Sequence, residues 1–222
     1  MWNGFWRYRY LLWNLVSRDF KLKYRRSVLG VVWSVLNPLL MCLVYWAVFS
    51  SLMDMRGSGI DNFAVFLMCG QLLFNFFNEA TSTSMSSVLS AAPLLKKVYI
   101  PKYIFPLEKC CFAMVNCVFS FVALLLVMIF TRATFYWTIF LSWLPLVLLF
   151  FFSCGLGLLL SALAVYFRDM MHLYSILTMG WMYATPLFYP ITALPETLQK
   201  LMKLNPLYHY INLFRNLMMY GN

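Results

Sequence analysis

Residues 137–166 read WTIFLSWLPLVLLFFFSCGLGLLLSALAVY, and this run contains no charged side chain. A helix needs about 20 apolar residues to cross the roughly 30 Å of hydrocarbon in a bilayer. Four further apolar runs lie near residues 31–52, 62–84, 104–130 and 173–190. The last run is the weakest because Pro186 and Pro190 interrupt its end. The runs predict an all-α polytopic membrane protein with about five transmembrane helices.

The composition agrees with a lipid environment. Of the 222 residues, 63% are hydrophobic and 11% are charged, whereas a soluble domain carries about 25% charged residues. A soluble fold of this length would expose large apolar patches and aggregate. The net charge of +10 does not indicate nucleic acid, because the basic residues cluster before Gly30 and beside the apolar runs, as in other membrane proteins.

The N-terminal segment is too charged to cross a bilayer, yet residues 3–26 keep a helical period. Apolar side chains fall on one arc of the helix and basic side chains on a neighbouring arc: Tyr8, Leu11, Leu12, Leu15 and Leu22 on the first, and Arg7, Arg18, Lys21 and Arg25 on the second. We expect residues 1–29 to form a cytoplasmic amphipathic helix beside a membrane domain at 30–222. A plain positive-inside anchor is a compatible alternative.

The distribution of lysine and arginine predicts the orientation. With the N-terminus inside, twelve basic residues lie in inside segments and five, Arg215 among them, lie in outside segments. The N-terminus is therefore expected in the cytoplasm, and five spans would put the C-terminus outside. The tail at 191–222 is amphipathic and suits short re-entrant helices, whose non-helical backbone must be buried in protein or wet.

The inside loop before the third span suggests a short helix at about 92–99. Ser90 is a plausible N-cap, Pro93 suits a first turn, and Pro101 disfavours helix at Ile100. The helix would carry apolar Leu94, Leu95 and Val98 beside basic Lys96 and Lys97. Composition alone favours a surface turn with positive-inside lysines, whereas the bounded helix favours a docking element for a soluble partner.

Glu79 is the carboxylate expected at membrane depth, where an ionisable group is costly and often functional. The hydroxyl-rich stretch that follows it, 81–87, favours a wet position facing the bundle interior. Glu108 and Lys109 are expected to mark the interface at the start of the third span. Arg168 and Asp169 end the fourth run, where pairing and simple solvation are equally expected.

Aromatic residues make up 19% of the chain. Several lie in the outer half or at the ends of spans, where an interfacial belt is expected. Rings along a path could also stack on sugars, but a belt needs no substrate. These rings include Phe74, Phe77, Tyr183, Phe188 and Tyr189.

Motifs for self-contained chemistry are missing from the sequence. It has no GxxxxGK[ST] phosphate loop, no HExxH and no GxSxG elbow. The six cysteines form no CxxC, and His172 and His209 stand alone, so no metal site is expected. The energy for uphill transport would therefore come from a partner or from an ion gradient.

Five motifs in order resemble the ABC-2 type permease family, in particular the subgroup that exports lipid-linked polysaccharides. Residues 24–40, YRRSVLGVVWSVLNPLL, are similar to the start of its first span, and 94–102, LLKKVYIPK, to its coupling helix. Residues 165–169, VYFRD, are similar to the end of its fourth span. TPLFYP at 185–190 and NPL at 205–207 are similar to its outer gate region.

The resemblance implies a bacterial inner-membrane subunit that forms a homodimer and docks two ABC ATPase subunits. Those subunits would bind ATP and Mg²⁺, so this chain would be no enzyme and would need no cofactor of its own. A lipid-linked glycan, of the O-antigen, capsule or teichoic acid type, would move outward between the two copies. Membrane lipids would be partners, and nucleic acid would not.

The resemblance also implies roles for individual residues. ATPase coupling is expected at Leu94, Leu95, Lys96, Lys97, Val98 and Tyr99. Substrate phosphate or lipid headgroups are expected at Arg18, Lys21, Arg25 and Arg26. A glycan path is expected along Phe74, Phe77, Tyr183, Phe188 and Tyr189. Structural or gating roles are expected for Glu79, Pro101, Arg168, Asp169, Pro186 and Pro190.

Three alternatives stay open at this point. The same fold could carry a drug or lipid, or a membrane glycosyl- or acyltransferase could use Asp19, Asp169 or Glu79. An ion-coupled transporter would need more buried charges and internal repeats. The family's sixth span would begin where Gly221 and Asn222 end this sequence, which favours a fragment.

Overall fold

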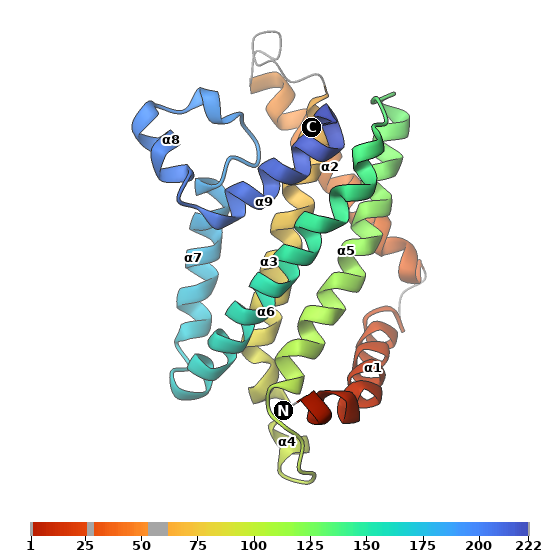
Figure 1. Ribbon diagram of the computed structural model, residues 1–222, viewed down its shortest axis with the longest axis vertical. Helices are drawn as coiled ribbons and strands as arrows, with labels where there is room; N and C mark the ends of the chain where they lie inside the picture. Colours follow the sequence, from red (N-terminus) through yellow and green to blue (C-terminus); the bar gives the residue numbers. More distant parts are fainter. Residues whose placement is uncertain (1, 26–28, 53–61, 222) are drawn as a thin grey trace.

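The computed structural model describes residues 2–25, 29–52 and 62–221, and over these residues the chain is helical with no strand (Figure 1). The predicted all-α architecture is therefore confirmed. The longer helices are α1 (Trp2–Tyr24), α2 (Trp33–Leu52), α3 (Phe63–Ser90), α5 (Ile104–Phe130), α6 (Trp143–Tyr166) and α7 (Met170–Ala184). Shorter pieces are η1 (Gly30–Val32), α4 (Ala92–Leu95), η3 (Trp137–Ser142), η4 (Ile191–Ala193), α8 (Glu196–Met202), α9 (Pro206–Arg215) and η5 (Asn216–Tyr220).

Four helical segments among the described residues are long and apolar enough to span a membrane: Gly30–Ser50, Phe63–Ser90, Ile104–Phe130 and Trp137–Tyr166. The expected fifth span at 173–190 is instead α7, a helix of 15 residues, about 22 Å long at about 1.5 Å per residue. It ends at Ala184 because Thr185 is extended, with φ −83° and ψ 134°. Pro186 favours that conformation in the residue before it.

The most enclosed helix is α3, which lies between α5 and α6 (Figure 1). It begins at an Asn62 side chain that accepts from the backbone N–H of Val65. It runs to Ser90 rather than to the expected residue 84, because its hydroxyls bond back to carbonyls of the preceding turn. Thr81 donates to Phe77 O at 2.8 Å and Thr83 to Glu79 O at 2.6 Å. The polar stretch is thus satisfied within the helix.

Small residues let α3 and α6 approach closely at the inner half of the bundle. A Cβ on Gly157 would lie 2.9 Å from Ser84 Cβ, which real contacts do not allow. The Ser84 hydroxyl also donates to Pro106 O in α5 at 2.9 Å. Gly157 therefore allows α3 and α6 to pack closely, as small residues in membrane spans commonly do.

The C-terminal segment folds over the end of the bundle that carries the start of α3. Figure 1 shows α8 beyond the end of α7, and α9 running obliquely toward α3. Asn205 caps α9 by accepting from Leu207 N, and it also accepts from Trp181 Nε1 in α7 at 3.0 Å. Its amide nitrogen donates to the Thr185 hydroxyl at 3.0 Å. The Asn205 side chain thus connects α7, Thr185 and α9 by hydrogen bonds.

Arg215, at the end of α9, joins the segments of this region by hydrogen bonds, and we call this set of bonds the Arg215 clamp. It is 6% exposed, and its Nη1 donates to Pro186 O at 2.9 Å. Its Nη2 donates to Leu187 O at 2.9 Å and to Phe66 O at 3.2 Å. The guanidinium also lies 3.5 Å from the centre of the Phe66 ring. The count of lysine and arginine residues placed Arg215 in an outside segment, which stays a prediction; the structure adds that its charge is buried and holds backbone carbonyls.

Replacing Arg215 should loosen this end of the molecule. Arg215→Met keeps an apolar stem but leaves the carbonyls of Pro186 and Leu187 buried without donors, at a cost of about 3 kcal/mol. Gly70→Ala should destabilise as well, because its Cβ would lie 2.7 Å from Arg215 Nη2. We expect both variants to lower the thermal unfolding midpoint in detergent. Lys203→Met, at an exposed residue, is the control, and equal midpoints for all three would contradict the clamp.

Candidate functional site

The loop between α3 and α5 projects from one end of the bundle, next to the N-terminal part of α1 (Figure 1). Its helix α4 is one turn, Ala92–Leu95, rather than the expected helix at 92–99. Pro93 lies in its first turn as predicted, but the N-cap is Ala91, and Ser90 donates to Ser87 O at 2.9 Å instead. The helix ends at Leu95, where the backbone N–H of Lys96 bonds to Ala92 O, and residues 96–100 continue as turn and irregular chain.

The six residues predicted for ATPase coupling divide into two groups. Leu94 and Leu95 are partly buried and pack against a cluster that contains Leu15 of α1 and Phe105 of α5. The exposed group contains Lys96, Lys97, Val98 and Tyr99. Tyr99 is 92% exposed. Only the second group offers an open surface, and the first group attaches the loop to α1.

A cluster of charges fixes α1 against the start of α5. Lys109 pairs with Asp19, and its Nζ also lies 3.4 Å from Glu108 Oε2. Lys109 bonds to Asp19 Oδ2, whereas Arg18 donates to Asp19 Oδ1 from Nε at 3.0 Å and from Nη2 at 2.9 Å. Burial alone would raise the pKa of Asp19, but the bonds and charges of Lys109 and Arg18 outweigh it and lower that pKa. Asp19 is therefore an ionised acceptor, unsuited to act as a general acid.

The basic residues proposed for phosphate differ in their surroundings. Arg18 is exposed but paired with Asp19. Lys21 and Arg25 are exposed, and no hydrogen bond or ion pair is found for them within the described part of the chain. Arg26 lies outside the described residues. A role for this set at phosphate stays a prediction.

A polar cavity of about 540 Å³, open to one side, lies between the end of α1 and helices α2, α3 and α5. Glu79 is part of its wall, and its Oε1 accepts from Asn116 Nδ2 at 2.6 Å. The Nζ of Lys23 lies 3.7 Å from the same oxygen. Tyr24 and Ser34 share a hydrogen bond across the gap between α1 and α2. We call this cavity the amide pocket. Its wall includes Trp33, Asn37, Pro38, Met41, Gln71, Asn75, Asn78 and Ser120.

Most residues of the amide pocket were not singled out by the sequence reasoning, although the sequence contains a signal. On α3, Gln71, Asn75, Asn78 and Glu79 follow the spacing i, i+4, i+7 and i+8, which places them on one helix face. Amides within an apolar run need hydrogen-bond partners inside the protein. That pattern indicates a polar interior, and only the packing of α2 and α5 shows that the interior is a cavity.

The aromatic residues expected along a glycan path lie mainly in the core. Phe74, Phe77 and Phe188 are buried within the chain. Phe77 packs on Trp181, with ring centres 5.3 Å apart, and Phe188 stacks on Phe49 at 5.1 Å. These three rings therefore do not line an open surface of the chain. Tyr183 remains exposed, and Tyr189 is half-buried and donates to Tyr183 O at 2.9 Å.

The remaining residues with expected structural or gating roles lie at turns. Arg168 and Asp169 are both exposed between α6 and α7, and no ion pair joins them within the described residues. Asp169 starts α7 through its backbone carbonyl, which accepts from Leu173 N at 3.1 Å. Pro101 precedes α5, and Pro190 precedes η4.

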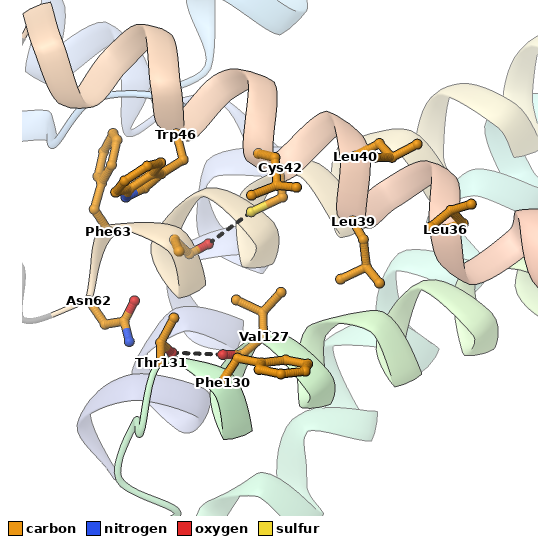
Figure 2. Close-up of a pocket in the computed structure, with 12 residues that line it drawn as sticks. Leu36, Leu39, Leu40, Cys42, Trp46, Asn62, Phe63, Val127, Phe130 and Thr131 are labelled. Carbon is orange, nitrogen blue, oxygen red and sulfur yellow. Dashed lines mark hydrogen bonds between the residues drawn. The ribbon is translucent and has the colours of Figure 1, made fainter.

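A second cavity, of about 800 Å³, lies between α2, the start of α3 and the end of α5. Figure 2 shows Leu36 and Leu39 of α2 on one side and Val127 and Phe130 of α5 on the other. Among the described residues its wall has no charged side chain, and Cys42 and Thr131 bond to the backbone at Ala64 and Val127. The described lining is mainly apolar and suits hydrocarbon.

The carboxylates required by the enzyme alternative do not form one catalytic group. Asp19 is paired with Lys109 on α1, Asp169 is exposed at a turn, and Glu79 lies in the amide pocket. Among the described residues, no set of three His, Cys, Asp or Glu side chains could hold a metal ion.

Similarity to known proteins shows the family to which the chain belongs. The family model for ABC-2 type transporters matches residues 10–219. An O-antigen export system permease protein of Klebsiella pneumoniae is 30% identical over 216 residues, which cover 95% of this chain and 81% of the relative. A protein of the same description from Myxococcus xanthus is 32% identical over 204 residues, 91% of this chain and 77% of the relative. The polysialic acid transport protein of Escherichia coli is 23% identical over 211 residues, 93% and 80%. This chain belongs to the ABC-2 type transporter family.

Proposed function

We propose that the chain is the membrane-spanning permease subunit of an ABC exporter that moves a lipid-linked polysaccharide outward across the bacterial inner membrane. The observation that carries the proposal is similarity along nearly the whole chain to permeases whose names state O-antigen export and capsule polysaccharide export. Four described segments suited to cross a bilayer support it.

The energy would come from a separate ATPase. The sequence has no phosphate loop, so ATP and Mg²⁺ would bind to the partner rather than to this chain. Two copies of the permease and two ATPase subunits would form the exporter. The exposed Lys96, Lys97, Val98 and Tyr99 would contact the ATPase, combining positive charge with an aromatic anchor of the kind that dominates many interfaces.

The packing of α1 suggests how a movement of the ATPase would pass from the loop between α3 and α5 to the amide pocket. Leu94 and Leu95 of the loop share one apolar cluster with Leu15 of α1. At its other end, α1 contributes Lys23 and Tyr24 to the amide pocket. A push on the loop would therefore shift α1 as a packed body and move one wall of the pocket. The Asp19–Lys109 pair would hold α1 to α5 during that motion.

The orientation can be tested with reporter fusions. The loop at 91–103 and α1 lie at the same end of the bundle (Figure 1), and the positive-inside rule places that end in the cytoplasm. We expect alkaline phosphatase, which folds only outside, to be inactive when fused after Tyr99. It should be active when fused after Thr134, in the loop before η3. The reverse pattern of activity would invert the proposed topology.

Coupling can be tested by co-purification with the ABC ATPase encoded nearest to the chain. Lys97→Glu with Tyr99→Ala removes one cation and the aromatic anchor without touching the leucines that pack on α1. We expect the two-plus-two complex to weaken at least about tenfold, as loss of about 1.4 kcal/mol implies. Lys203→Glu at the opposite end is the control. A complex equally stable in all three proteins would refute docking at this loop.

A further inference from the structure

The amide pocket contains side chains suited to a ligand that both donates and accepts hydrogen bonds. Five carboxamides from three helices line it: Asn37 of α2, Gln71, Asn75 and Asn78 of α3, and Asn116 of α5. A carboxamide offers two donor hydrogens and an acceptor oxygen. Hydroxyl groups also both donate and accept, so neighbouring hydroxyls of a sugar ring match such amides in pairs.

Two acceptors in the wall are buried and unused. Gln71 is 9% exposed and Asn116 is 8% exposed. Gln71 Oε1 and Asn116 Oδ1 have no hydrogen-bond partner. A buried acceptor left unpaired is destabilising, and both residues line the cavity. Both oxygens are almost fully shielded from solvent, so the amides open to a ligand in the pocket are instead the exposed Asn37 and Asn75.

The charges of the pocket favour a neutral ligand. Lys23 Nζ and Glu79 Oε1 lie 3.7 Å apart. A ligand is larger than this separation, so it experiences little net charge from the pair. Lys23 is also held above the Phe112 ring, with its nitrogen 5.4 Å from the ring centre. An anion placed beside Glu79 would be repelled by a carboxylate in a medium of low dielectric constant. Headgroup phosphate is thus a poor occupant.

Size and shape agree with a sugar. The volume of about 540 Å³ lies within the range of about 300–1,000 Å³ that is usual for small-ligand sites. Trp33 lines the pocket and is 41% exposed, which leaves an aromatic surface for the apolar face of a ring. Pro38 and Met41 extend that apolar side.

We propose that the amide pocket binds a neutral, hydroxyl-bearing sugar ring of the cargo, within each copy of the chain. This inference rests on the proposed export of a polysaccharide. Asn37, Asn75 and Asn78 bind ring hydroxyls, and Trp33 covers the ring. Because Lys23 and Tyr24 of α1 form part of the wall, displacement of α1 changes the shape of the sugar site.

Saturation-transfer NMR on the full chain, purified in detergent, tests binding directly. The probe is a neutral oligosaccharide of two or three repeats, released from the surface polymer of the strain that encodes the chain. We expect transfer to the sugar protons with the wild type. Asn37→Ala and Asn75→Ala should weaken binding about tenfold each. Asn75 is exposed in the pocket, so its variant keeps the fold. Asn212→Ala, an exposed amide on α9, is the matched control.

Three results would overturn the sugar site: no transfer with the wild type, equal binding by the pocket variants and the control, or displacement of the sugar by inorganic phosphate. The proposed function is measured separately, as surface polymer in cells with and without the chain. Polymer that persists without the chain overturns the export proposal. Intact export with no sugar binding overturns the pocket proposal alone.

Discussion

Hydrocarbon offers no hydrogen-bond partner, so every polar group along a buried membrane helix must be satisfied by the protein or by a wet cavity. The structure depends on this constraint at α3. Its hydroxyls bond to its own backbone, as Thr81 and Thr83 do. Its amides and Glu79 face the amide pocket, and α5, α6 and α7 cover the rest of the helix. The bundle is arranged so that its most polar span is its most enclosed one.

Much of the fold can be predicted from the sequence, because the length of an apolar run is set by the bilayer. The spans at 104–130 and 137–166 agree with the structure to the residue. Local chemistry explains the differences. Pro186 ends α7 early, and α3 continues to Ser90 with hydroxyls such as those of Thr81 and Thr83 bonded to its own carbonyls. The burial of Arg215 could not be predicted, since Phe66 lies 149 positions away and a cation near a span end is normally solvated.

Only part of the candidate site could be predicted from the sequence. The amphipathic pattern of α1 predicts a surface helix, but it does not reveal that Leu15 meets Leu94 and Leu95 or that Asp19 pairs with Lys109. Aromatic residues in a span are ambiguous, because a ring in the core and a ring on a path have the same sequence signature. Phe77 proved to be core. Side-chain amides in a span indicate a polar interior more clearly, because burying an amide without a hydrogen-bond partner costs free energy.

The position of Arg215 also has a consequence for biosynthesis. Phe66 leaves the ribosome 149 residues before the arginine that binds its carbonyl, an interval of roughly 7 to 30 s at bacterial elongation rates. During that interval the four long spans can insert, while the carbonyl of Phe66 lacks its donor; the carbonyls of Pro186 and Leu187 are made only 29 and 28 residues before Arg215. The end of the molecule that Arg215 closes is therefore completed by a late step of synthesis, and a chain that has not yet reached Arg215 lacks the donor for all three carbonyls.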